Sequence, residues 1–139
     1  MDGKMKILVV DDETPVAMMI VFLLTRAGFD VTVAHDGRKA LELATEYKFD
    51  LITLDIDLPI FSGFEICGEL KQRHACRHTP IVFVTGRVSE EDRQRARQVG
   101  AADYFSKPFE PSVFVSRLIS LVKKGAPAWP KGKAQSFNF

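Results

Sequence analysis

The chain has 139 residues, of which 46% are hydrophobic and 27% charged, and its formal net charge is +1. These values are typical of one globular domain, and the low net charge argues against a nucleic-acid-binding surface spread over the whole molecule. No apolar run reaches the roughly 18 residues that a membrane helix needs, and the first residues lack the features of a secretory signal peptide. Cys67 and Cys76 make no disulfide framework, so we expect a cytoplasmic protein with reduced thiols.

The N-terminal half predicts two strand–helix units. A strand at residues 7–10 is followed by a helix with Thr14 as N-cap, Pro15 as first helical residue and Gly28 as left-handed stop. The apolar stripe expected on this helix consists of Val16, Ile20, Leu23, Leu24 and Ala27. A more mixed strand at 31–34 follows, and then a second helix around Ala40, Leu41 and Ala44.

The C-terminal half predicts three further units. A strand at 51–54 precedes a helix that opens with a capping box, Ser62 with Glu65. A strand at 81–84 precedes a helix that begins after Ser89 and has acidic residues in its first turn. A short strand at 103–105 precedes a last helix opened by Pro111. Its expected apolar stripe is Phe114, Leu118, Leu121 and Val122.

This alternation predicts an α/β fold of the doubly wound (βα)5 type, with a five-stranded parallel sheet in the order 2-1-3-4-5. The runs at 7–10, 51–54 and 81–84 are almost unbroken, as expected for strands buried on both faces. Residues 1–124 form the predicted domain, and residues 125–139 read as a tail or linker outside it. We expect the aromatic residues of that tail, Trp129, Phe137 and Phe139, to pack on the domain or on a neighbouring molecule.

Polar side chains follow four of the five predicted strands. They are Asp11, Asp12 and Glu13 after the first strand, Asp55 after the third, Thr85 after the fourth and Lys107 after the fifth. The second strand is followed only by His35-Asp36. In a sheet of this order ligands bind beyond the carboxyl ends of the strands, where the winding direction reverses. The sequence therefore predicts one crevice that gathers Asp11, Asp12, Asp55, Thr85 and Lys107.

The chemistry of this set favours phosphoryl transfer. Carboxylates packed together repel unless a cation joins them, and oxygen ligands with open positions suit Mg²⁺. Lys107 adds a fixed positive charge and Thr85 a hydroxyl, so Asp55 could attack in line to give an aspartyl phosphate. Strand-end capping would explain Thr85 taken alone, but it explains the whole set poorly.

Several motifs resemble the receiver domains of bacterial two-component response regulators, including chemotaxis regulators. They are Asp11-Asp12-Glu13, Asp55 with Pro59 and Gly63 downstream, Thr85-Gly86, and the run from Tyr104 to Phe109 that contains Lys107-Pro108. The resemblance covers about residues 5–123 and implies a flavodoxin-like fold. The chain has Ser62 where the family often has Asp or Asn, and Gly86 where alanine is common.

The resemblance also implies roles for these residues. Asp55 would accept a phosphoryl group from a sensor histidine kinase or a histidine phosphotransfer protein. Asp12, Asp55 and the backbone carbonyl of Asp57 would ligate Mg²⁺, with Asp11 acting through a water. Thr85 and Lys107 would bind the phosphoryl oxygens, and the Lys107–Pro108 peptide would be cis.

Thr85 and Tyr104 would act as a switch on the face made by the fourth helix, the fifth strand and the fifth helix, where an unknown downstream protein would bind. The protein would be no enzyme beyond Mg²⁺-dependent self-phosphorylation and autodephosphorylation. It would contact neither nucleic acid nor membrane directly. Homodimer formation, the cognate kinase, and a stand-alone or longer protein all stay open.

Two alternatives belong to other classes. Asp55-Ile-Asp57 resembles the D-x-D motif of haloacid-dehalogenase-type phosphatases, although Leu58-Pro59 does not continue that motif. A receiver-like module that binds partners without phosphorylation is the other alternative. We interpret the stretch from His74 to His78 as an exposed basic loop rather than a metal site. We expect Phe61, Phe64 and Phe83 in the core.

Asp57 stands two residues past Asp55, and its side chain should lie over the mouth of the site. Arg87 stands two residues past Thr85, which is the matching position on the next loop. One hypothesis is that these two side chains pair and slow the loss of the phosphoryl group a few-fold; the alternative is that both point into solvent.

Overall fold

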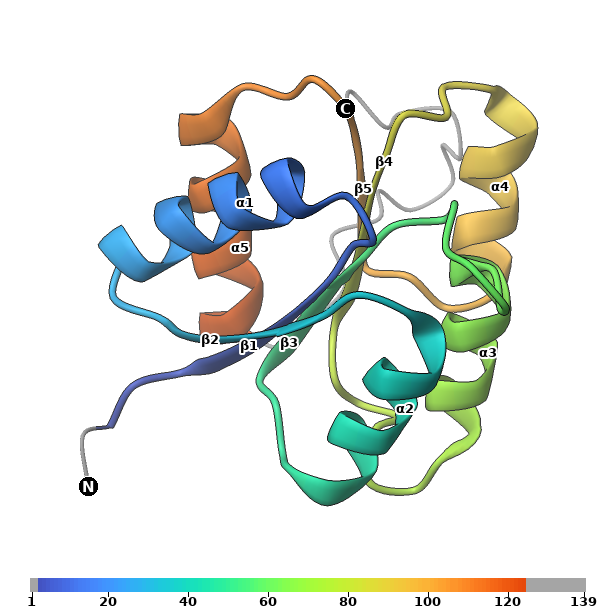
Figure 1. The fold of residues 1–139 in the computed structure, drawn as a ribbon, viewed down its shortest axis with the longest axis horizontal. Coiled ribbons are helices and arrows are strands. Elements are labelled where there is room, and N and C mark those ends of the chain that lie inside the picture. The colour runs from blue at the N-terminus through green and yellow to red at the C-terminus, as the bar shows by residue number, and fades with distance from the viewer. Residues whose placement is uncertain (1–2, 125–139) are drawn as a thin grey trace.

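The structure, a computed structural model, describes residues 3–124 of the chain. It consists of five strands alternating with five helices within that range (Figure 1). The strands are β1 (Lys6–Val10), β2 (Asp30–Ala34), β3 (Leu51–Leu54), β4 (Ile81–Thr85) and β5 (Asp103–Ser106). The helices are α1 (Thr14–Arg26), α2 (Gly37–Glu46), α3 (Gly63–Gln72), α4 (Glu90–Gln98) and α5 (Pro111–Lys124).

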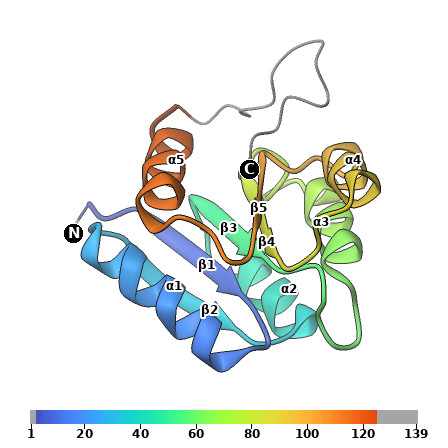
Figure 2. The same cartoon turned by 90° about the horizontal axis from the view of Figure 1, so that it is seen from above.

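The strands form one parallel sheet in the order β2-β1-β3-β4-β5. Helices α1 and α5 cover one face of this sheet, and α2, α3 and α4 cover the other (Figures 1 and 2). The predicted fold class and strand order are therefore confirmed. All strands run in the same direction, so their carboxyl ends meet along one edge.

The core follows from the two-residue period of the buried strands. Leu8 and Val10 of β1 pack in the cluster under α2, α3 and α4, whereas Ile7 and Val9 pack in the cluster under α1 and α5. Burying a side chain of this size stabilises the fold by about 1.5–3 kcal/mol. The sheet is thus fixed from both sides, which makes its carboxyl edge a rigid platform.

Most helix starts agree with the sequence. In α3 Ser62 and Glu65 form both hydrogen bonds of the capping box, and Ser89 accepts from the backbone N–H of Asp92 at the start of α4. Gly28 has a φ of +99°, the left-handed conformation expected after α1. The stripe of α5 is buried as expected, except that Val122 is half-buried.

Two details of α1 correct the prediction. The helix begins at Thr14, with Glu13 rather than Thr14 as N-cap. The reason is that the carboxylate of Asp11 accepts from the backbone N–H of Glu13 at 2.9 Å, which starts the helical turn one residue early. Ala27 is exposed because it follows the last helical turn, and Ala17 takes the expected place in the core.

Phe61 is a further correction, because 37% of it is exposed in the loop before α3. Phe64 and Phe83 are buried as expected, and their rings meet edge to face at 5.4 Å. Within residues 3–124 no helix has the length and apolar character to cross a membrane. The predicted tail, residues 125–139, lies outside the described part of the chain.

Candidate functional site

Backbone hydrogen bonds between strand ends bring the predicted residues together. Asp11 and Asp55 directly follow β1 and β3, and the backbone N–H of Asp55 donates to the carbonyl of Val10 at 3.1 Å. Thr85 ends β4, and its carbonyl accepts from the backbone N–H of Lys107 at 2.7 Å. The Lys107–Pro108 peptide is cis, as expected. All the residues of the predicted crevice therefore reach the same edge of the sheet.

Lys107 lies at the centre of an acidic cluster. Its Nζ donates to a carboxylate oxygen of Asp55 at 2.8 Å, of Asp11 at 2.9 Å and of Glu13 at 3.3 Å. Asp11 and Asp55 are only 1% and 4% exposed. Two nearly buried carboxylates thus share one ammonium group, and its position fixes the direction in which their free oxygens point.

Burial and the charges of this cluster shift two pKa values in opposite balance. Burial raises the pKa of Asp11 above its ordinary value, against the lowering effect of the Lys107 hydrogen bond. Burial alone would lower the pKa of Lys107, but its hydrogen bonds to Asp11 and Asp55 and their charges outweigh burial and raise it. Lys107 is therefore a permanent cation, whereas the acidic cluster carries excess negative charge.

Asp11, Asp12 and Asp55 fit a divalent cation. Each offers a carboxylate oxygen, and these atoms lie within 4.8 Å of one another. Asp12 is exposed, so the cluster opens toward solvent on that side. Hard oxygen donors with room for water are the set that Mg²⁺ prefers.

The loop between β3 and α3 depends on a close approach at Gly63. A Cβ atom there would overlap the backbone oxygen of Asp55 and lie 2.8 Å from the Cα of Ile56.

The same loop contains a strained turn. Ile60, with a φ of +74°, is the central residue of a tight turn in which the N–H of Phe61 donates to the carbonyl of Pro59 at 2.8 Å. A β-branched residue in this region is strained by about 1–3 kcal/mol. Strain of this kind is common next to functional sites.

Thr85 and Tyr104 are both fully buried. The hydroxyl of Tyr104 donates to the backbone carbonyl of Arg87 at 2.8 Å, and the Oγ1 of Thr85 accepts from the N–H of Arg87 at 3.4 Å. Burial, reinforced by the charge of Asp92, raises the pKa of Tyr104 to about 12. The two predicted switch residues therefore meet at the same loop residue.

The predicted pair at the mouth of the site is present. The guanidinium of Arg87 donates to Oδ1 of Asp57 from Nη2 at 2.7 Å and from Nε at 3.0 Å. Sequence reasoning missed that Nη1 also lies 3.6 Å from Asp92 in the first turn of α4. It missed His35 as well, whose Nδ1 lies 3.1 Å from the backbone carbonyl of Asp11. Neither contact has a signal in the sequence, because the first depends on the direction of the Arg87 side chain and the second joins two separate loops.

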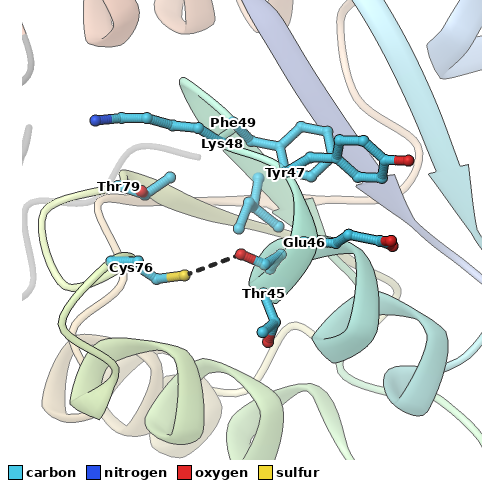
Figure 3. A pocket seen from close by; sticks show the side chains of 10 residues that line it. Thr45, Glu46, Tyr47, Lys48, Phe49, Cys76 and Thr79 are labelled. Atoms are coloured by element: carbon cyan, nitrogen blue, oxygen red, sulfur yellow. Dashed lines mark hydrogen bonds between the residues drawn. The ribbon is translucent and has the colours of Figure 1, made fainter.

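Other candidates carry no such chemistry. His74, Cys76 and His78 do not form a metal-binding group within the described residues, although Cys76 is buried rather than exposed as the loop prediction implied. The Cys76 thiol donates to the carbonyl of Ala44 at 3.6 Å in a hollow of about 270 Å³ (Figure 3). Apart from Ile52 of β3, the residues that line this hollow precede β3 and β4, so it lies at the opposite edge of the sheet from the acidic cluster.

Known proteins resemble this chain in both fold and sequence. The family model described as "Response regulator receiver domain" matches residues 7–119. The alkaline phosphatase synthesis transcriptional regulatory protein PhoP of Bacillus subtilis (strain 168) is 37% identical over 131 residues, which are 94% of this chain and 54% of PhoP. The chain thus spans about half the length of this curated relative.

Solved structures agree. The chemotaxis protein CheY4 of Vibrio cholerae superposes with a TM-score of 0.81 at 34% identity, covering 85% of this chain and 98% of CheY4. The receiver domain of a sensor histidine kinase from Pseudomonas aeruginosa PAO1, with a magnesium ion coordinated in its active-site cleft, has a TM-score of 0.81 at 28% identity. That match covers 87% of this chain and 99% of the receiver.

These comparisons give no support to the phosphatase alternative or to a phosphorylation-independent binding module. The chain belongs to the response regulator receiver domains, the phosphoryl-accepting regulatory modules of two-component systems.

Proposed function

We propose that Asp55 is the residue that accepts the phosphoryl group, and that the donor is the phosphohistidine of a sensor histidine kinase or of a histidine phosphotransfer protein. The observation that carries this assignment is the position of Asp55. It is a nearly buried carboxylate within 2.8 Å of the Lys107 ammonium and within the Asp11–Asp12 acid cluster.

In the proposed reaction a carboxylate oxygen of Asp55 attacks the phosphorus atom in line. The new phosphorus–oxygen bond forms as the phosphorus–nitrogen bond breaks, and the electron pair of that bond returns to the imidazole nitrogen of the donor. Asp55 needs no general base, because a carboxylate is already the nucleophilic form. The N–H of Asp57, which donates to Oδ1 of Asp55 at 3.1 Å, orients the attacking group.

Lys107 and Thr85 have complementary roles in this proposal. The Lys107 ammonium neutralises the phosphoryl oxygens as they approach the acidic cluster, and the Thr85 hydroxyl donates to one of them. Asp11, Asp12, Asp55 and the backbone carbonyl of Asp57 would hold Mg²⁺, directly or through water. The ion, when bound, offsets the repulsion between the incoming phosphoryl group and the carboxylates.

Output would run through Thr85 and Tyr104. Both residues hydrogen-bond to the backbone of Arg87. A shift of Thr85 toward a phosphoryl group would therefore move the Arg87 carbonyl to which the Tyr104 hydroxyl donates. We propose that this rearrangement alters the face of α4, β5 and α5, where a downstream protein binds. Loss of the phosphoryl group to water returns the face to its starting state.

The test is intact-protein mass spectrometry after incubation with acetyl phosphate and Mg²⁺. The wild-type chain should gain one adduct of about 80 Da, the mass of a transferred phosphoryl group, and Asp55→Asn should gain none. The matched control is Asp30→Asn, an exposed aspartate at the start of β2 that should leave the adduct unchanged. An adduct of normal yield on Asp55→Asn would rule out the assignment.

A further inference from the structure

Arg87 has an unusual set of contacts, because its side chain and its backbone bind different parts of the molecule. The guanidinium joins Asp57 of the β3–α3 loop, through Oδ1 at 2.7 Å, to Asp92 of α4, at 3.6 Å. The backbone N–H and carbonyl join the two switch residues, Thr85 and Tyr104. No other described residue connects all four.

The contacts continue beyond Arg87 in both directions. Toward the site, the backbone N–H of Asp57 donates to Oδ1 of Asp55 at 3.1 Å. Toward α4, Asp92 accepts from the hydroxyl of Ser89 at 2.9 Å, and that hydroxyl accepts from the N–H of Asp92 at 3.1 Å. The carboxylate that Arg87 reaches is therefore part of the cap of α4, which makes it a firm anchor for the guanidinium.

The position of α4 bears directly on Tyr104. Arg93, the residue after Asp92, places its guanidinium carbon 5.9 Å from the centre of the Tyr104 ring. The Phe83 ring also packs against the Tyr104 ring, tilted by 53° with the ring centres 6.2 Å apart. A movement of the first turn of α4 would thus disturb the packing of Arg93 against the Tyr104 ring. Through Arg87 it would also shift the backbone carbonyl that accepts the hydrogen bond from the Tyr104 hydroxyl.

We infer that Arg87 is a positioning residue: by bridging Asp57 and Asp92 its guanidinium holds the β4–α4 loop in the one place where the Arg87 carbonyl can keep Tyr104 buried. The side chain acts through the backbone, because the Tyr104 hydroxyl donates to the Arg87 carbonyl while the guanidinium binds Asp57 and Asp92. The bridge spans exposed groups, so it is weak enough to bias an equilibrium between positions of Tyr104 without deciding whether the chain folds. The inference deepens the proposed function, because Tyr104 is the switch residue of that proposal.

The test uses the full chain labelled with 3-fluorotyrosine and carrying Tyr47→Phe, so that Tyr104 is the one labelled position. Fluorine NMR then reports the exposure of Tyr104 through the shift of its resonance between H₂O and D₂O. The measurement is made without phosphoryl donor or Mg²⁺. Its result is therefore independent of whether Asp55 is the acceptor, and failure of the one proposal is not failure of the other.

In the Arg87→Ala variant the backbone carbonyl remains, yet we expect the exposed population of Tyr104 to rise several-fold. Asp57→Ala and Asp92→Asn should each give part of that rise. Arg87→Lys, which can hold one carboxylate, should restore part of the buried population. The matched control is Arg38→Ala, an exposed arginine of α2, which should give no change.

An unchanged Tyr104 signal in Arg87→Ala would overturn the inference, as would an equal response in Arg38→Ala. Thermal unfolding of each variant separates positioning from general damage. Arg87→Ala should unfold within a few degrees of the wild type, and a Tyr104 response that appears only together with loss of the folded state would also refute the positioning role.

Discussion

At the scale of single residues, the site is governed by an imbalance of charge. Asp11, Asp12 and Asp55 supply three carboxylates, while Lys107 supplies the one cation among residues 3–124 that hydrogen-bonds to Asp11 and Asp55. Asp11 and Asp55 are nearly buried, so solvent screens their repulsion poorly. Without a metal ion this repulsion destabilises the folded state, so we expect a divalent cation to stabilise it.

The first prediction concerns the metal. Mg²⁺ should raise the unfolding free energy of the wild type by a few kcal/mol at saturating concentration, since a ligand at 100 times its Kd adds about 2.7 kcal/mol. Asp12→Asn should be more stable than the wild type without metal, because it relieves repulsion, and should gain much less from Mg²⁺. Urea denaturation with Mg²⁺ and with EDTA measures both effects. Equal gains from Mg²⁺ in the two proteins would exclude Asp12 from the site.

The second prediction concerns the Asp57–Arg87 pair. Its groups are 57% and 46% exposed, and such a pair contributes about 1 kcal/mol or less. That is too little to matter for folding but enough to change a rate several-fold, since about 1.4 kcal/mol is tenfold. We expect Asp57→Ala and Arg87→Ala to lose the phosphoryl group a few-fold faster than the wild type, because water reaches the phosphorus atom more easily.

Decay of the phosphorylated protein after removal of the donor measures this rate. The double mutant should decay no faster than the faster of the two single mutants. The pair does not shield the site if the rate increases of the two single mutants multiply in the double mutant, or if both single mutants decay at the wild-type rate.

At the scale of elements, the loops at the carboxyl edge are positioned by close packing against the strand ends. The start of α3 lies so near β3 that Gly63 has no room for a side chain over the backbone of Asp55 and Ile56. The start of β5 buries Asp103, whose Oδ1 accepts from the N–H of Tyr104 at 2.8 Å and lies 3.4 Å from Arg117 of α5. Both contacts hold a functional residue by its backbone.

Gly63→Ala is the third prediction. The added methyl group must push the β3–α3 loop away from Asp55, so we expect a loss of unfolding free energy of about 1–3 kcal/mol and slower phosphoryl uptake. Gly68→Ala in the same helix is the matched control, because a Cβ there meets nothing within 4 Å. It should stabilise the chain by about 0.5–1 kcal/mol. Urea denaturation measures the unfolding free energies of both variants. Equal values for Gly63→Ala and Gly68→Ala would contradict the close approach at Gly63.

The fourth prediction is a pH dependence from Asp103. Burial raises its pKa above the ordinary value of 3.8, against the lowering effect of the Tyr104 N–H and of Arg117. The folded state therefore binds this proton more tightly than the unfolded chain, and stability is lost as the pH rises from 3.8 through the raised pKa.

Asp103→Asn keeps an oxygen for the Tyr104 N–H but cannot ionise. Its unfolding free energy should fall less than that of the wild type over this pH window, as measured by urea denaturation at a series of pH values. Parallel curves for the two proteins would show that Asp103 is not perturbed.

At the scale of the whole molecule, the fold could be predicted because its signals are local and agree with one another. Almost unbroken apolar runs such as Ile81–Val84, and caps such as Ser62, define buried parallel strands and helix starts. The members of the site were predictable for the same reason, since strand ends in a known order converge. The Asp57–Arg87 pair followed from equal spacing on adjacent loops.

The remaining features depend on side-chain geometry that residue spacing does not reveal. Arg87 reaches Asp92 in the first turn of α4, a contact that depends on the direction in which the long arginine side chain leaves the β4–α4 loop. Glu13 replaced Thr14 as N-cap because Asp11 serves the site and the turn at once. Phe61 was predicted in the core but lies in the loop before α3, next to the strained Ile60, where it is only partly covered.

The assignment of Asp55 is tested most sharply by locating the phosphoryl group on the chain. Borohydride reduces an aspartyl phosphate to homoserine, so the phosphorylated wild-type chain is treated with borohydride, digested and sequenced by mass spectrometry. We predict homoserine at position 55 alone, and none when Mg²⁺ is removed before the donor is added. Homoserine at Asp11, Asp12 or Asp57 instead, or an adduct that borohydride leaves unchanged, would contradict it.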